Sequence, residues 1–362
     1  MKILQIIQKP ELRGAEIFAC QLSEELIKLG HQVDVVYLFE HKNFDLSFSL
    51  SYIALGAVQE KRFFDFKAYR RLRDIIKQGK YDVVQANASD TLKYAVISKV
   101  LYGWKAPLIF RNASKMGDFM KNGLHRSLNR FFLKKCSYFI SVCENCRQDL
   151  IALYKGASDR SCTITIGTYP FEEIPSLPLN SKPSEPVFIN VSSFVPEKNH
   201  EFLLRLFSGY FTNHKQGYLW LVGDGKLRNN LEQLVSKLGI GERVRFWGYR
   251  KDVISIIKSS DIMLMPSRVE GLPGVILEAL ACGVPVIASA VGGIPEIIFN
   301  NENGYCVEKE DESVYIKHLN TLVENDALRK RLAQAGKDLI YREYLMPHIA
   351  KRFAEQYKII VG

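Results

Sequence analysis

Two glutamates in the second half of the sequence flank a short segment that could bind a phosphorylated ligand. Glu270 follows an apolar run expected to form a strand, and Glu278 lies on a helix expected to start near Gly274. Between them, Gly271–Gly274 is predicted to form a tight loop, and Pro273 suits the first turn of a helix because its missing amide hydrogen is not needed there. Free backbone amides at the helix start, with the positive end of the helix dipole, can hold a diphosphate without a metal. We therefore expect a diphosphate site with one carboxylate on either side.

Three other segments place groups that could bind a phosphate or a base directly after predicted strands. Lys198 precedes a helix, where a compact cation suits a phosphate. Gly223 lies in the turn LVGDG, which lets the backbone approach a ligand closely. Tyr249 and Arg250 are available to pack on a base or to bond it. Taken singly, each of these residues also fits an ordinary tight turn or a solvated side chain, and the same holds for the two glutamates.

The elements that must position these residues alternate along the chain. Strand, helix and strand patterns recur through residues 1–168, then five prolines within 17 residues indicate a linker over 169–186. A second alternation fills 187–345, and an amphipathic helix over 346–362 is expected to return to the first domain. Such alternation is typical of parallel sheets with crossover helices. The sequence thus predicts an α/β protein with two tandem Rossmann-like domains facing a central cleft, the expected ligand site.

Composition and charge narrow the class of protein. The chain has 362 residues, of which 47% are hydrophobic and 24% charged, so a packed globular protein is expected and disorder is not. The formal net charge is +10, and residues 1–185 alone have eight more basic than acidic side chains. Such a surplus suits a phosphorylated substrate, an anionic membrane or a nucleic acid. No groove-reading or base-stacking module is visible, so nucleic acid is not an expected partner.

Two basic segments of the first domain interleave cations with apolar side chains. Lys61–Lys80 contains eight basic residues and several aromatic ones, and Lys115–Lys135 combines a predicted helical apolar face with surrounding cations. Each basic side chain near an anionic leaflet contributes about 1 kcal/mol, so these segments could hold the protein peripherally on a membrane. The same patterns also fit helices that pack on the core and carry solvated charges.

The sequence favours a cytoplasmic protein without a metal. Its first apolar run is five residues long and is not followed by a signal cleavage site, and the apolar stretch 272–294 is interrupted by Glu278, Pro and Gly. Cys143 and Cys146 have metal-ligand spacing but lack a second close pair, so core thiols are expected. No Asp-x-Asp spacing occurs in the chain. We expect neither a metal nor a cofactor, and possible peripheral contact with the inner face of the cytoplasmic membrane.

The motifs resemble those of the family-four retaining glycosyltransferases with the GT-B fold. VPEKN, LVGDG, FWGYRKDV and EGLPGVILEALACGVPVIAS occur in the family's order and spacing. The resemblance covers both domains and the returning terminal helix. It implies transfer of a hexose-type sugar from a nucleoside-diphosphate sugar to an acceptor hydroxyl, with retention at the anomeric carbon and with UDP as the expected nucleotide and GDP next.

The resemblance also implies roles for single residues. Glu270 and Lys198 would be the catalytic pair, with Glu270 facing the donor sugar and Lys198 holding the diphosphate beside loop amides. Glu278 would bond the ribose hydroxyls, and the backbone around Tyr249 and Arg250 would meet the base. The residues implied in donor binding are Gly14, Ser193, Lys198, Gly223, Tyr249, Arg250, Glu270, Gly271, Leu272, Pro273, Gly274 and Glu278.

On the acceptor side, the sequence departs from the family pattern. Asn87 and Asn112 stand where the family often has His, and together with Arg13 and Arg111 they are the expected sugar or acceptor contacts. The basic first domain and the expected cytoplasmic location favour a cell-envelope glycan or a lipid-linked acceptor, as in lipopolysaccharide, O-antigen or capsule synthesis.

One departure keeps rival functions open. Ser193 replaces an Arg that commonly accompanies the phosphate-binding Lys, and Arg268 or Arg13 are the candidate substitutes. A catalytically silent nucleotide-sugar-binding or membrane-scaffolding subunit is therefore one alternative. A nucleotide-sugar epimerase of the same fold, which would act on the donor without an acceptor, is another.

Overall fold

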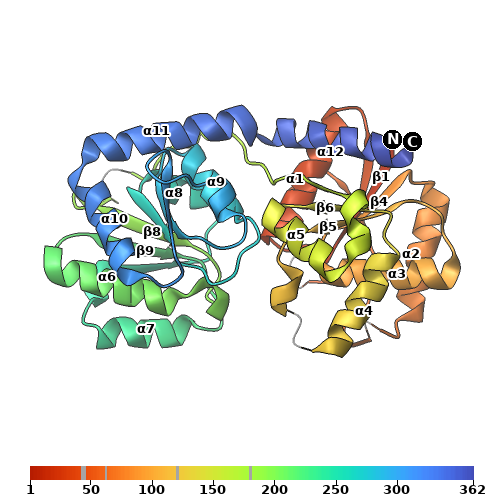
Figure 1. Ribbon diagram of the computed structural model, residues 1–362, viewed down its shortest axis with the longest axis horizontal. Coiled ribbons are helices and arrows are strands. Elements are labelled where there is room, and N and C mark those ends of the chain that lie inside the picture. The colour runs from red at the N-terminus through yellow and green to blue at the C-terminus, as the bar shows by residue number, and fades with distance from the viewer. Residues whose placement is uncertain (42–45, 62, 120–121, 179–181) are drawn as a thin grey trace. The chain divides into compact units, whose positions relative to one another are not determined.

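The chain forms two compact units, each built on one parallel sheet (Figure 1). This computed structural model describes residues 1–41, 46–61, 63–119, 122–178 and 182–362. The first unit comprises Met1–Gly167 and Met346–Gly362, and the second comprises Thr168–Leu345. The predicted fold class, two Rossmann-like α/β domains, is confirmed.

The first unit has a seven-stranded sheet of order β3-β2-β1-β4-β5-β6-β7. The central strands are apolar runs buried on both faces, which is why they read as near-continuous hydrophobic segments. The chain leaves β1 in one direction and returns at β4 on the other side, so the carboxyl ends of β1 and β4 form the topological switch point. The strands are β1 (Lys2–Ile7), β2 (Gln32–Tyr37), β3 (Ser51–Ala54), β4 (Val83–Ala86), β5 (Leu108–Asn112), β6 (Tyr138–Ser141) and β7 (Ser161–Thr163). The helices are α1 (Gly14–Lys28), α2 (Phe66–Gly79), α3 (Ser89–Tyr102), α4 (Gly123–Lys134) and α5 (Glu144–Leu153).

The last helix, α12 (Met346–Val361), completes the first unit by packing on α1 (Figure 1). The ring of Phe353 lies 5.8 Å from the ring of Phe18 on α1. The hydroxyl of Tyr357, also on α12, donates to Gln85 Oε1 at 2.7 Å. The amide of Gln85 donates in turn to Gln5 Oε1 and Asn87 Oδ1, so a fully buried polar network joins α12 to β1 and β4.

The second unit has a six-stranded sheet of order β10-β9-β8-β11-β12-β13. Figure 1 shows α6 and α7 on one face of this sheet and α8, α9 and α11 on the other. The strands are β8 (Val187–Val191), β9 (Tyr218–Val222), β10 (Val244–Gly248), β11 (Ile262–Met265), β12 (Val286–Ser289) and β13 (Gly304–Val307). The helices are α6 (His200–His214), α7 (Arg228–Lys237), α8 (Val253–Lys258), α9 (Gly274–Ala281), α10 (Glu312–Glu324) and α11 (Asp326–Glu343).

The proline-rich segment expected as a linker is anchored to the second unit. Lys258 at the end of α8 donates to the carbonyls of Phe171 and Ile174, and Ser259 Oγ accepts from the amide of Leu177. Prolines remove amide donors from this segment but leave its carbonyls, and the ammonium group of Lys258 donates hydrogen bonds to two of these carbonyls.

Residues 179–181 of the proline-rich segment lie outside the described residues. The same holds for residue 62 in the first basic segment and for residues 120–121 in the second.

No helix within the described ranges is long and apolar enough to cross a membrane.

The buried network under α12 makes a testable contribution to stability. We expect Tyr357→Phe to destabilise the first unit by about 1–3 kcal/mol, because Gln85 Oε1 loses its donor while remaining buried. Urea unfolding monitored by fluorescence measures the change. The neighbouring exposed Lys358 supplies the control, since Lys358→Ala should leave the free energy of unfolding within about 0.5 kcal/mol of the wild-type value. Equal midpoints for Tyr357→Phe and wild type would show that the network does not stabilise the docked helix.

Candidate active site

The structure brings Lys198 and Glu270 together at the carboxyl ends of β8 and β11. Lys198 ends the short 3-10 turn Pro196–Lys198, and its Nζ lies 2.6 Å from Glu270 Oε1. The Glu270 side chain is 7% exposed, whereas that of Lys198 is 23% exposed. Their loops are also joined through the backbone, since the Arg268 amide donates to the Glu197 carbonyl at 2.8 Å. The pair is therefore a shielded ion contact whose cation still reaches solvent.

A second loop fixes Glu270 from the other side. The amide of Gly293, after β12, donates to the Gly271 carbonyl at 2.6 Å. Gly292 has a φ of +59°, and a Cβ there would lie 2.3 Å from the Glu270 carbonyl oxygen. Only glycine permits this approach. Sequence reasoning did not assign Gly292 to the site; the Gly-Gly pair directly after an apolar strand is the signal that could have found it.

The start of α9 presents free amides next to this pair. Pro273 is the N-cap residue, and no side chain in the described part of the chain caps the helix. Within the same part of the chain, the backbone amides of Leu272, Gly274 and Val275 donate no hydrogen bond. These amides and the helix dipole favour an anion at this end of α9. The arrangement has the donors that a diphosphate needs.

Glu278 lies one turn further along α9 and is only partly exposed. Burial raises the pKa of its carboxyl to about 7. No described residue donates a hydrogen bond to it or pairs with it. A carboxyl with these properties is available to accept hydrogen bonds from ligand hydroxyls once it is ionised.

The turns after β9 and β10 lie against the turn after β8. Gly223 has a φ of +131°, and a Cβ there would lie 2.1 Å from the Ser192 carbonyl oxygen. Its amide donates to the Gly248 carbonyl at 2.9 Å. Beyond β10, Tyr249 is 60% exposed, while the guanidinium of Arg250 donates to both carboxylate oxygens of Asp252 at 2.7 and 2.6 Å. Arg250 is thus already paired with a carboxylate, and Tyr249 presents its ring to solvent.

Both candidate substitutes for the missing arginine are paired with carboxylates of their own unit. Ser193 is exposed. Arg268 Nε donates to Glu310 Oε1 at 2.6 Å, and the same oxygen accepts from Asn199. Arg13 belongs to the first unit, where its Nε lies 2.8 Å from Glu11 Oε1. Lys198 therefore remains the cation closest to the Glu270 carboxylate in the described second unit.

The two asparagines expected to contact the acceptor are engaged within the first unit. Asn87 is 1% exposed; its Nδ2 donates to Gln5 Oε1 at 2.8 Å and its Oδ1 accepts from Gln85. Asn112 is also 1% exposed, and its Nδ2 donates to the Cys146 carbonyl at 3.0 Å. In this structure the hydrogen bonds of both side chains join elements of the first unit.

Arg111 and the glycine segment occupy the same unit. Arg111 is 2% exposed, its Cζ lies 4.1 Å from the centre of the Phe18 ring, and burial lowers the pKa of its guanidinium to about 10. Its Nε and Nη1 donate to no described residue. Gly14 begins α1 and is exposed, and Glu16, in the first turn, is buried so that its pKa is raised to about 7. Sequence reasoning did not single out Glu16, since a carboxylate in a first helical turn is ordinary.

The described residues contain no cluster of three or more His, Cys, Asp or Glu side chains placed to hold a metal ion. Cys143 caps α5, with its Sγ accepting from the Cys146 amide at 3.4 Å, and both cysteines are buried and form no disulfide.

Two family models match this chain in tandem. The model of glycosyl transferases group 1 matches residues 175–339, and that of Glycosyltransferase Family 4 matches residues 12–168. The chain belongs to the GT-B glycosyltransferases. The matched ranges coincide closely with the second and first units.

This glycosyltransferase is similar to several named enzymes, one of which is named for lipopolysaccharide core biosynthesis. It is 32% identical over 174 residues to N-acetyl-alpha-D-glucosaminyl L-malate synthase of Bacillus anthracis (48% of this chain, 45% of the relative), and 31% identical over 166 residues to the lipopolysaccharide core biosynthesis glycosyltransferase LpsE of Rhizobium meliloti (46% and 48%). These two matches span about half the length of each relative. A third is 26% identical over 361 residues (98% and 97%): the GalNAc-alpha-(1->4)-GalNAc-alpha-(1->3)-diNAcBac-PP-undecaprenol alpha-1,4-N-acetyl-D-galactosaminyltransferase of Campylobacter jejuni.

Among solved structures, this glycosyltransferase is similar to Anabaena HepE in complex with UDP-glucose. The TM-score is 0.86 at 18% identity, covering 99% of each chain. At this identity the likeness shows the shared fold.

The raised pKa of Glu278 has a consequence for stability. Because the folded pKa of about 7 exceeds the ordinary 4.5, wild type loses stability as the pH rises from about 4.5 to 7, while Glu278→Gln does not. We expect the melting temperature of Glu278→Gln, measured relative to wild type, to rise over that interval and to level off above pH 7. Differential scanning calorimetry at several pH values measures this, with the exposed Glu302→Gln as the matched control. A pH-independent difference between Glu278→Gln and wild type would show that the carboxyl titrates normally.

Proposed function

We propose that this glycosyltransferase moves a hexose-type sugar from UDP to a hydroxyl of a cell-envelope glycan or lipid-linked acceptor, with retention and without a metal ion; GDP is the second candidate nucleotide. The observation that carries the proposal is the contact of Lys198 with Glu270 beside the uncapped start of α9. A cation, free amides and a carboxylate then lie within one small region of a single unit. A nucleoside-diphosphate sugar needs this set of groups.

The proposed chemistry follows from where charge develops. The bond between the anomeric carbon and the diphosphate breaks, a bond to the acceptor oxygen forms on the same face, and the acceptor proton passes to a diphosphate oxygen. Negative charge grows on the leaving diphosphate, so the ammonium group of Lys198 and the amides of Leu272 and Gly274 would stabilise it. Glu270 would orient the sugar, whose ring gains oxocarbenium character.

The ion pair itself adds a step to donor binding. In the free site Lys198 Nζ contacts Glu270 Oε1, so a diphosphate must compete with a nearly buried carboxylate for the same cation. When the diphosphate binds Lys198, Glu270 is released to accept hydrogen bonds from sugar hydroxyls. This exchange links recognition of the diphosphate to recognition of the sugar.

The choice of donor and acceptor is supported by the relatives. HepE was solved with UDP-glucose, LpsE is named for lipopolysaccharide core biosynthesis, and the Campylobacter relative for a diphospho-undecaprenol-linked glycan. The epimerase alternative predicts conversion of donor without acceptor, and the silent-subunit alternative predicts binding without turnover.

Donor binding and turnover separate the roles of the two glutamates. We expect one class among UDP, GDP and ADP sugars to stabilise wild type, and the stabilisation to survive EDTA. Glu278→Gln should weaken donor affinity about tenfold or more, since one hydrogen-bonding carboxylate is lost. Glu270→Gln should keep or tighten UDP binding, because Lys198 no longer has a competing carboxylate, while turnover falls by about a hundredfold.

Calorimetry measures the affinities and chromatography of products measures turnover with and without acceptor. Glu302→Gln serves as the control for a glutamate away from the site. Product formed without acceptor would favour the epimerase, and unchanged kinetics in both site variants would refute the assignment.

We further propose that the first unit associates with an anionic membrane surface. Phe64 and Phe66 are 77% and 56% exposed at the start of α2. On α4, Leu128 and Phe131 are 37% and 43% exposed. Exposed cations accompany them in both segments: Lys61, Lys67, Arg70, Arg71, Lys77, Lys80, Arg126, Arg130, Lys134 and Lys135. Such apolar side chains among cations suit the boundary between lipid headgroups and acyl chains.

Vesicle flotation tests this association. We expect wild type to float with vesicles rich in anionic phospholipid but not with neutral ones, and less at high salt. The double variant Phe64→Ser, Phe66→Ser should lose most of the binding. Ile359→Ser is the matched control, because Ile359 is 72% exposed on α12, outside both basic segments. Equal flotation of the double variant and the control would refute a role for the two phenylalanines.

A further inference from the structure

The first unit contains a pocket of about 360 Å³ at the ends of two of its helices. It lies where α2 and α3 end and where the chain enters β4 and β5, and its apolar wall includes Ile76, Tyr81, Trp104 and Ala106. These are the amino ends of the strands, whereas the switch point lies at carboxyl ends. The volume falls within the range of about 300–1,000 Å³ typical of small-ligand sites. Among the described residues that line the pocket, none is implied in donor binding.

Three lysines line this pocket without a partner. Lys77 lies in the last turn of α2, Lys80 caps that helix, and Lys105 precedes β5. All three residues are exposed. In the described ranges none of them forms a hydrogen bond or an ion pair, and no acidic residue lines the pocket. The pocket therefore presents three ammonium groups that are not paired with a carboxylate.

The negative charges near the pocket do not balance these lysines. Asp34 is paired with Lys2, whose Nζ lies 4.0 Å from its Oδ2, and Asp82 is exposed and accepts from the backbone amide of Lys2 at 2.7 Å. Each helix C-terminus carries about half a negative elementary charge, so the ends of α2 and α3 together offset about one ammonium charge. A net positive charge remains even when Asp82 is counted. The pocket therefore favours an anion.

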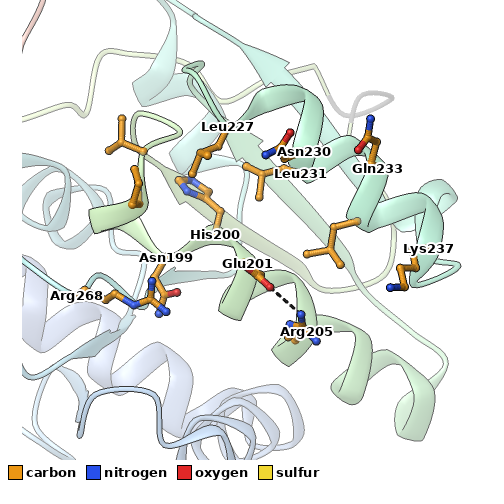
Figure 2. A pocket seen from close by; sticks show the side chains of 13 residues that line it. Asn199, His200, Glu201, Arg205, Leu227, Asn230, Leu231, Gln233, Lys237 and Arg268 are labelled. Atoms are coloured by element: carbon orange, nitrogen blue, oxygen red, sulfur yellow. Dashed lines mark hydrogen bonds and ion pairs between the residues drawn. The ribbon is translucent and has the colours of Figure 1, made fainter.

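The larger groove of the second unit has cations with partners (Figure 2). This groove, of about 530 Å³, lies beside the start of α6, and Arg268 from the loop that carries Glu270 lines it. Its arginines are already paired, Arg205 with Glu201 and Arg268 with Glu310. The groove thus adjoins the candidate active site. The pocket of the first unit differs on both counts, because its lysines are unpaired and no residue of that site lines it.

We propose that the first-unit pocket binds a phosphomonoester, the phosphate group of a phosphorylated sugar or of a lipid headgroup. At neutral pH such a group carries a charge of about −1.5 to −2 and three acceptor oxygens. The three lysines supply ammonium donors for these oxygens, and the carbon part of the ligand packs on Ile76 and Ala106. A phosphodiester or a carboxylate carries a single charge and is attracted less strongly. The inference does not rest on the proposed reaction, because no residue assigned to that reaction takes part in it.

Calorimetry with glucose 6-phosphate tests the proposal, and glucose is the uncharged comparison. We expect saturable binding of glucose 6-phosphate and none of glucose. The affinity should fall between about pH 7.5 and about pH 5, because the phosphate has a second pKa of about 6 and becomes a monoanion while the lysines stay charged. No saturable binding of glucose 6-phosphate to wild type would overturn the proposal.

Lys80→Gly separates binding from stability. Lys80 has a φ of +50°, a left-handed conformation that favours glycine, so this change should leave the melting temperature equal or higher. It should nevertheless weaken the binding of glucose 6-phosphate about tenfold, because one charge-assisted hydrogen bond is lost. Lys105→Gln should weaken it by a similar factor. The matched control is Lys351→Gln on α12, which should bind as wild type does, since Lys351 is exposed and does not line the pocket.

Two further comparisons locate the binding and identify its source. Lys198→Gln should keep its affinity for glucose 6-phosphate; a loss in this variant alone would place the ligand at the candidate active site and overturn the proposal. Equal affinities of wild type, Lys80→Gly and Lys105→Gln would overturn it as well. Displacement of glucose 6-phosphate by vesicles that contain phosphatidic acid identifies a lipid headgroup as a ligand, and no displacement identifies a soluble one. Equal displacement by phosphatidylglycerol, a phosphodiester, would show general attraction to anions and overturn the proposal.

Discussion

The contact between Lys198 and Glu270 is the constraint that the loops around the candidate site of the second unit have to satisfy. The two residues are 72 positions apart, and they meet because β8 and β11 are adjacent parallel strands whose carboxyl ends share one edge of the sheet. Bringing a carboxylate to 7% exposure costs solvation free energy, which a single cation at 2.6 Å offsets. The surrounding loops must hold this geometry, and they do so with backbone hydrogen bonds from Arg268 and Gly293. The pair is thus kept by the fold and is itself a modest contributor to stability.

Glycines set how closely those loops can approach. At Gly292 and Gly223 the neighbouring carbonyl oxygens lie where any Cβ would stand, and both residues have positive φ. The result is a layer of backbone in which the turns after β8, β9, β11 and β12 touch directly. Side chains then have little freedom in this layer, so Lys198 and Glu270 emerge from it in fixed directions. In the first unit, side chains rather than close backbone contacts join the elements. The buried amides of Gln5, Gln85 and Asn87 form hydrogen bonds with one another and with Tyr357.

The sequence predicted the central strands well but missed three of the four edge strands, the exception being β10. Strands β1, β8 and β11 are buried on both faces and read as apolar runs. The edge strands β3, β7 and β13 are three or four residues long, and none was expected from the sequence, because a short strand bonded on one side lacks a continuous apolar run. For the site, spacing predicted an anion site at the start of α9, where the structure has a helix end without a side-chain cap. Spacing did not reveal that Lys198 contacts Glu270, that Gly292 closes on it, or that Asn87 is held by a buried network, since each depends on which loops become neighbours.

The discontinuity of the first unit bears on how the protein is made. Residues 346–362 leave the ribosome after the second unit, yet α12 packs on Phe18 and supplies the Tyr357 hydroxyl to Gln85. During synthesis, residues 1–167 therefore wait with an uncovered apolar face and an unsatisfied buried amide network while the second unit, which is continuous in sequence, can fold unaided. The first unit therefore completes its fold after the second unit, although most of the first unit is synthesised earlier. The interval in which the α1 face stays open is set by the time needed to translate the second unit, and it is the stage at which a nascent chain most needs protection from aggregation.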